Sequence, residues 1–84
     1  MNKRKLYKRV LANRKNVRFG DFATLIEAFG FRLSRTSGSH HLFVHPRIPE
    51  LLNLQEIDGQ VKPYQIQQWL RFVERYNLQM EDPT

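Results

Sequence analysis

The stretch Gly38-Ser39-His40-His41-Leu42-Phe43-Val44-His45-Pro46 decides how this chain is expected to fold and what it is expected to do. It joins a turn to a short apolar run of β-forming residues, and it holds all three histidines of the chain within six positions. Histidine changes charge nearest to physiological pH, so this cluster is suited to proton transfer. Histidines in strands also fill half-exposed faces or bond to a carbonyl group, and the spacing alone leaves both interpretations open.

The residues before this stretch supply a partner strand. Residues 31–35 alternate apolar and polar side chains, and residues 36–39 form a polar turn, so we expect a β-hairpin. Because side chains alternate between the two faces of a strand, Leu42 and Val44 are expected to face the core. The opposite, wet face is expected to carry His41, Phe43 and His45, with Arg32 or Ser34 and Asn53 or Gln55.

Helical patterns surround this hairpin. Residues 3–13 form a basic amphipathic pattern, and residues 22–29 place apolar side chains at i, i+3, i+4 and i+7 behind a cap at Gly20 or Asp21. Residues 62–77 open with Lys62-Pro63, and proline suits the first turn of a helix. The sequence therefore predicts three helices.

The expected fold class is α+β, in which helices pack on one face of a three-stranded antiparallel sheet. Residues 52–57 supply the third strand. We assign residues 1–16 to a basic N-terminal helix and linker, residues 17–78 to the main domain and residues 79–84 to a flexible tail.

Length and composition narrow the class of protein. Eighty-four residues allow one small domain, and the absence of cysteine excludes disulfides and thiolate chemistry and fits a reducing cytoplasm. No apolar run approaches the roughly 18 residues of a membrane span. We expect a soluble cytoplasmic protein without a membrane partner.

Positive charge is concentrated in the first part of the chain. The net charge is +6, but residues 1–35 carry ten Lys and Arg against two Asp and Glu, a net +8 that leaves −2 for the rest. A one-sided basic surface is typical of a protein that binds polyanions, most often nucleic acid. The sequence therefore predicts an RNA or DNA partner.

The Gly-Ser-His motif at residues 38–40 carries a family resemblance. Together with Gly30-Phe31 before it and the Lys62-Pro63 helix after it, the motif resembles the HicA family of toxins from bacterial toxin–antitoxin pairs over residues 17–78. The resemblance implies a double-stranded-RNA-binding-domain-like fold and a metal-independent endoribonuclease that cleaves mRNA. It also implies neutralisation by a HicB-like antitoxin. The family's histidine falls on His40, and on His41 in members that place it one residue later.

The residues themselves could support this chemistry. A histidine can remove the proton of the RNA 2′-hydroxyl, and Arg35 and Lys62 can offset charge on the phosphate. Backbone amides near Gly38 and Ser39 can approach a phosphate closely. The candidate catalytic residues are therefore His40 and His41, and the candidate RNA-binding residues are Gly38, Ser39, Arg35, Lys62, Lys15 and Arg18.

Two other interpretations remain open at the level of sequence. A non-catalytic RNA-binding module has the same fold and charge, and a pure interaction protein could use the basic face to bind an acidic partner. Zinc is disfavoured because strand alternation turns His40 away from His41 and His45. We expect no metal site, cofactor or small-molecule ligand.

Overall fold

The predicted hairpin is present in the computed structural model, which describes residues 2–81. Strands β2 (Arg32–Ser37) and β3 (His40–His45) pair antiparallel around a turn at Gly38 and Ser39. Gly38 has a φ of 57°, a conformation that glycine adopts without a steric cost. Strand β4 (Ile48–Gln55) pairs with the other edge of β3, which gives the sheet order β2-β3-β4.

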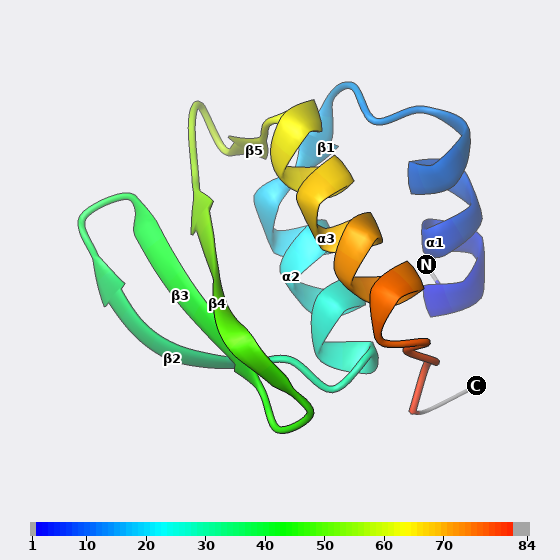
Figure 1. Ribbon diagram of the computed structural model, residues 1–84. Coiled ribbons are helices and arrows are strands. Elements are labelled where there is room, and N and C mark those ends of the chain that lie inside the picture. The colour runs from blue at the N-terminus through cyan, green and yellow to red at the C-terminus, as the bar shows by residue number, and fades with distance from the viewer. Residues whose placement is uncertain (1, 82–84) are drawn as a thin grey trace.

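Three helices lie on one side of this sheet. Helices α2 (Phe19–Ala28) and α3 (Pro63–Arg75) form the layer next to the sheet, and α1 (Lys3–Ala12) lies beyond them (Figure 1). Two short strands, β1 (Val17–Arg18) and β5 (Gln60–Val61), pair with each other at one end of the molecule. The expected α+β class with a three-stranded antiparallel sheet is confirmed, and so are the three helices.

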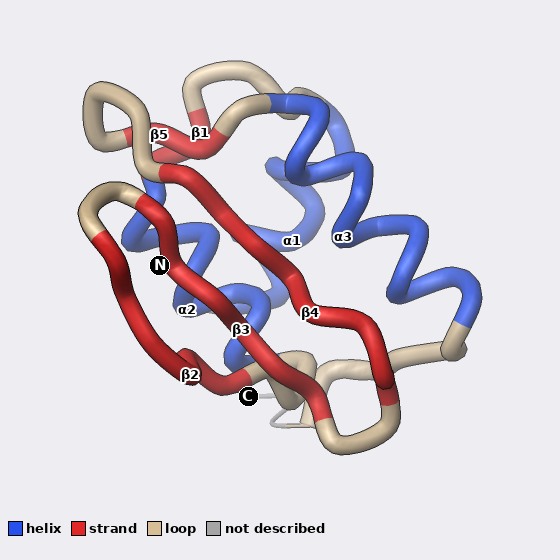
Figure 2. The backbone as a smooth tube through the Cα atoms, turned by 60° about the vertical axis from the view of Figure 1, so that its left-hand side comes forward, coloured by secondary structure: helices blue, strands red, loops and turns tan. Residues whose placement is uncertain are grey.

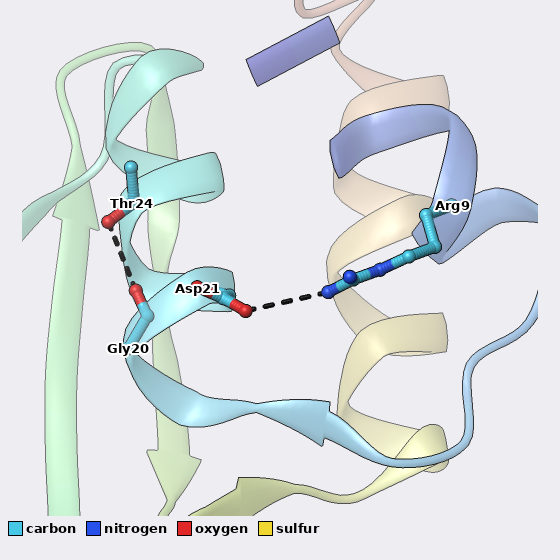
Figure 3. Close-up of polar contacts among 4 residues, drawn as sticks. All are labelled: Arg9, Gly20, Asp21 and Thr24. Atoms are coloured by element: carbon cyan, nitrogen blue, oxygen red, sulfur yellow. Dashed lines mark hydrogen bonds and ion pairs between the residues drawn. The ribbon is translucent and has the colours of Figure 1, made fainter. Parts of the chain in front are cut away.

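The start of α2 differs from the prediction. The helix begins at Phe19 and its N-cap is Arg18, so neither Gly20 nor Asp21 caps it. The carboxylate of Asp21 instead lies in the first turn and pairs with the Arg9 guanidinium of α1 at 3.4 Å (Figure 3). A carboxylate there is also favoured by the positive end of the helix dipole. Asp21 therefore helps to join α1 to α2.

The core centres on Trp69 of α3, which is fully buried. The rings of Tyr7, Phe22 and Phe29 meet its indole edge-on, with centroids 5.0–6.0 Å away. Tyr7 belongs to α1, and the same helix buries Leu6 and Val10. The basic helix is thus packed into the core through its apolar stripe.

The predicted faces of β3 are inverted. Phe43 and His45 are buried against the helices, whereas Leu42 and Val44 are only half-buried and face the open side of the sheet. In this arrangement the aromatic ring of Phe43 joins the core cluster, and neither Leu42 nor Val44 does. His45 can be buried because both of its ring nitrogens are hydrogen-bonded.

Strand β4 is longer than predicted, and the last described residues contact the rest of the fold. Strand β4 begins at Ile48, before the expected start at residue 52, and it accommodates Pro49 because it is an edge strand. In the segment assigned to a flexible tail, Met80 packs against the core and the Glu81 amide donates to the Ala28 carbonyl. The rest of that segment, residues 82–84, lies outside the described residues.

Candidate active site at the histidine hairpin

His40 and His41 are adjacent in sequence but lie on opposite faces of the sheet. His40 is in register with Ser37 and Gln55 on the open face. His41 is in register with Thr36 and Leu54 on the face that the helices cover. A site that uses one histidine therefore has different neighbours from a site that uses the other.

His40 is exposed at the point where the turn enters β3. Within residues 2–81 its imidazole has no hydrogen-bond or ion-pair partner. The turn before it is anchored, because the Glu56 amide donates to the Ser39 carbonyl at 2.9 Å. The Gln55 side-chain amide also donates to Ser39 Oγ at 3.4 Å. His40 thus presents a free imidazole from a fixed backbone.

Arg35 lies on the same open face as His40. It is in register with Leu42, and Ser37 is in register with His40, so Arg35 and His40 form a diagonal pair across two neighbouring strands. Such pairs have Cα atoms about 7–8 Å apart, within reach of a long side chain. Arg35 is exposed, and its guanidinium and the imidazole can contact one phosphodiester from the same side.

His41 is packed instead of free. Its ring stacks at a tilt on Phe19, the first residue of α2, with centroids 4.4 Å apart. Its Nε2 lies 3.6 Å from Glu56 Oε1 and its Nδ1 lies 3.5 Å from Thr36 Oγ1. These contacts join the start of β3 to α2 and to the segment after β4.

The other predicted cations lie around the β1–β5 pair. Lys15 and Lys62 line one concavity there, and Arg18 lines a second with Glu56. Glu56 contacts His41, so this group adjoins the His41 side of β3. Arg35 stands apart from these three cations on the open face. The predicted site residues therefore divide into two groups, one on each side of the strand.

His45 belongs to neither group. Its Nε2 lies 3.0 Å from the Phe29 carbonyl, and the Arg47 amide donates to its Nδ1 at 3.1 Å. Because the Arg47 amide donates to Nδ1, it is Nε2 that donates to the Phe29 carbonyl. The expectation that His45 lies on the wet face is wrong, and the residue is structural.

Sequence reasoning missed the partners of His41. Phe19 was outside the predicted helix, and Glu56 was treated only as part of a strand. Both contacts join residues at least 15 positions apart, so no local pattern reveals them. The fold brings them together by placing the start of α2 and the residue after β4 beside the start of β3.

Within residues 2–81, no three His, Cys, Asp or Glu side chains gather closely enough to hold a metal ion. In the same part of the chain, no helix is long and apolar enough to span a bilayer. No match is found for this chain among family models, curated proteins or solved structures.

Proposed function

We propose that this chain is a HicA-like toxin, a metal-independent endoribonuclease that cleaves mRNA with His40 as the general base. The observation that carries the proposal is the placement of His40. Its exposed imidazole, which has no hydrogen-bond or ion-pair partner among residues 2–81, stands on an anchored turn and shares an open sheet face with Arg35. This pair supplies the two functions that the reaction needs: a proton acceptor and a cation beside the phosphate.

The reaction would proceed by internal transfer at one phosphodiester. His40 accepts the proton of the 2′-hydroxyl, and that oxygen forms a bond to the adjacent phosphorus. The bond from phosphorus to the 5′-oxygen breaks, and the leaving oxygen takes a proton from water. The products are a 2′,3′-cyclic phosphate and a 5′-hydroxyl end. Arg35 offsets the charge that grows on the non-bridging oxygens.

The order of elements supports the same assignment. The three-stranded sheet β2-β3-β4 lies between α2 and α3 in the chain, apart from the two-residue strand β5, and both helices lie on one side of that sheet (Figure 1). This is the order of a double-stranded-RNA-binding domain, the fold that the HicA resemblance implies. A HicB-like antitoxin would neutralise the toxin by covering the face with His40, in the cytoplasm where mRNA is translated.

The test is cleavage of a short RNA by the wild-type chain and two variants. His40→Ala should lower the rate by about 10²–10⁴-fold, the usual effect of removing a general base. Circular dichroism should stay unchanged because His40 is exposed, and binding of a 2′-O-methyl RNA should change little because this analogue lacks the 2′-hydroxyl proton that His40 accepts. His41→Ala is measured in parallel as the competing assignment. Full activity in both variants would rule out the mechanism.

One observation favours a second candidate, a non-catalytic RNA-binding module. Among the described residues nothing orients the His40 imidazole, whereas general bases are commonly held by a hydrogen bond to a third group. A wild-type chain that binds RNA and never cuts it would support this candidate.

A further inference from the structure

The molecule presents two basic surfaces that face away from each other. Helix α1 contains five Lys and Arg and no acidic residue, and it lies on the far side of α2 and α3 from the sheet (Figure 1). The open face of the sheet lies in front of that layer, and no described segment covers it (Figure 2). One short RNA cannot lie flat on both surfaces. The structure therefore poses the question of which surface holds the substrate.

The open sheet face is basic, and the described part of the chain places no carboxylate on it. Its cations are Arg32, in register with Val44, and Arg35, in register with Leu42. The three strands of the sheet contain a single carboxylate, that of Glu50, and it points to the helix side, where it bonds with Tyr76. Among residues 2–81, nothing on the open face would repel a polyanion.

The same face also carries apolar side chains that the core does not use. Leu51 is 55% exposed and follows the alternation of β4 onto the open side. Leu42 and Val44 are half-buried, and neither packs against the hydrophobic core. Together they form a central apolar strip, which we call the Leu42–Val44–Leu51 strip, between the arginines and the outer edge of β4.

We propose that the open sheet face binds unpaired RNA, with the phosphates on Arg32 and Arg35 and the bases on the Leu42–Val44–Leu51 strip. The exterior of a duplex offers phosphates and hydroxyls, against which apolar side chains would be poorly matched. The bases of an unpaired strand are free to turn toward a sheet and lie on it, as they do in other domains that bind RNA on a sheet surface. This inference rests on the proposed function, because His40 lies on the same face.

The charge of this face favours RNA over a second copy of the chain as its binding partner. Two copies packed face to face would bring Arg32 and Arg35 of one against those of the other without an intervening carboxylate. An RNA strand instead brings one negatively charged phosphate per nucleotide to these arginines. The binding would be weakly selective for sequence, because phosphate contacts and apolar contacts to the base faces do not distinguish one base from another.

The experiment compares matched variants in binding to a 2′-O-methyl RNA, unpaired or as a duplex, from about 50 to 200 mM salt. Arg32→Ala/Arg35→Ala and Lys5→Ala/Lys8→Ala each remove two positive charges, the first pair from the sheet and the second from α1. The sheet pair should weaken binding at least tenfold and reduce the salt slope by about 1.4, since each contact to a single strand contributes about 0.7. The α1 pair should change affinity less than threefold.

A second comparison tests the apolar strip. Leu51→Glu and Leu11→Glu introduce the same change at exposed positions, on the sheet and on α1 respectively. Only Leu51→Glu should weaken the unpaired RNA, and the wild-type chain should prefer unpaired RNA to duplex. A greater loss from the α1 variants, or a preference for duplex, would overturn the inference. So would a dimer that Leu51→Glu dissociates and that does not bind RNA.

These results separate the two proposals. Binding that is lost in the sheet variants, by a chain that never cuts a cleavable RNA, supports the surface and refutes the ribonuclease. Cleavage that depends on His40 and Arg35 but is indifferent to Arg32 and Leu51 supports the ribonuclease and refutes the surface.

Discussion

The Nε2 of His45 lies 3.0 Å from the carbonyl oxygen of Phe29, which ties β3 to the end of α2. The bond is buried, and the Arg47 amide occupies the other ring nitrogen. His45→Ala would leave a buried carbonyl and an amide without this partner, at about 1–3 kcal/mol for each unsatisfied group. Urea unfolding should show this loss. The matched control is His40→Ala, which should change the free energy of unfolding by less than about 0.5 kcal/mol.

A second prediction concerns stability at low pH. The Tyr76 hydroxyl donates to Glu50 Oε1 at 2.6 Å, and this bond is the main cause that lowers the pKa of Glu50, with Arg75 adding to it. Because the pKa of Glu50 is lower in the folded chain, its ionised carboxylate stabilises the fold fully when the pH is above the ordinary pKa of a glutamate. This stabilisation is lost as the pH falls through the lowered pKa of the folded chain. Glu50→Gln should therefore flatten the fall in melting temperature between about pH 5 and pH 2. An unchanged pH profile would contradict this role.

The hydrogen bond between Tyr76 and Glu50 also predicts a loss of stability at high pH. The hydrogen bond to Glu50 raises the pKa of Tyr76 above its ordinary value of 10.0. The stabilisation is therefore complete when the pH is below 10.0, and it is lost as the pH rises through the raised pKa of the folded chain. Tyr76→Phe removes the titrating hydroxyl and should flatten the alkaline limb of the same profile. Tyr64→Phe is the control, since Tyr64 is exposed and should leave that limb as it is.

Helix α1 should be necessary for stability as well as for charge. Leu6 is buried against the helical layer, and Leu6→Ala should cost about 2–5 kcal/mol in the free energy of unfolding. Leu11 lies on the same helix and is 43% exposed, so Leu11→Ala should cost less than about 0.5 kcal/mol. Similar losses from the two variants would show that the apolar stripe of α1 does not pack as described.

The elements that sequence predicted well are those that one local pattern defines. The apolar spacing of residues 22–29 and the proline at residue 63 located two helices, and Gly38 with its polar neighbours located the hairpin. The orientation of β3 was wrong because Leu42 and Phe43 are both apolar, so alternation could not tell which of them faces the core. That choice depends on the helices, through Phe29 and the ring of Phe31 beside His45.

The candidate site was predicted only in part for the same reason. The motif located His40 and His41, and Arg35 followed from its place in the preceding strand. The separation of the two histidines by the sheet followed from alternation, but their neighbours did not, because Phe19 and Glu56 reach His41 from distant elements. Strands β1 and β5 have two residues each, too few for any periodic pattern.

The last prediction separates a positioning role of His41 from a catalytic one. His41 stacks on Phe19 and contacts Glu56, so we expect it to hold the start of β3 in place and to act through His40. His41→Phe preserves a ring against Phe19 and removes every proton-transfer group. Its cleavage rate should stay within about tenfold of wild type, with an unchanged pH profile, while His40→Phe loses about 10²–10⁴-fold. His41→Ala should fall between the two, since it loses the packing as well. If His41→Phe loses as much rate as His40→Phe and shifts the pH profile, His41 takes part in proton transfer and the base must be sought on the covered face of the sheet.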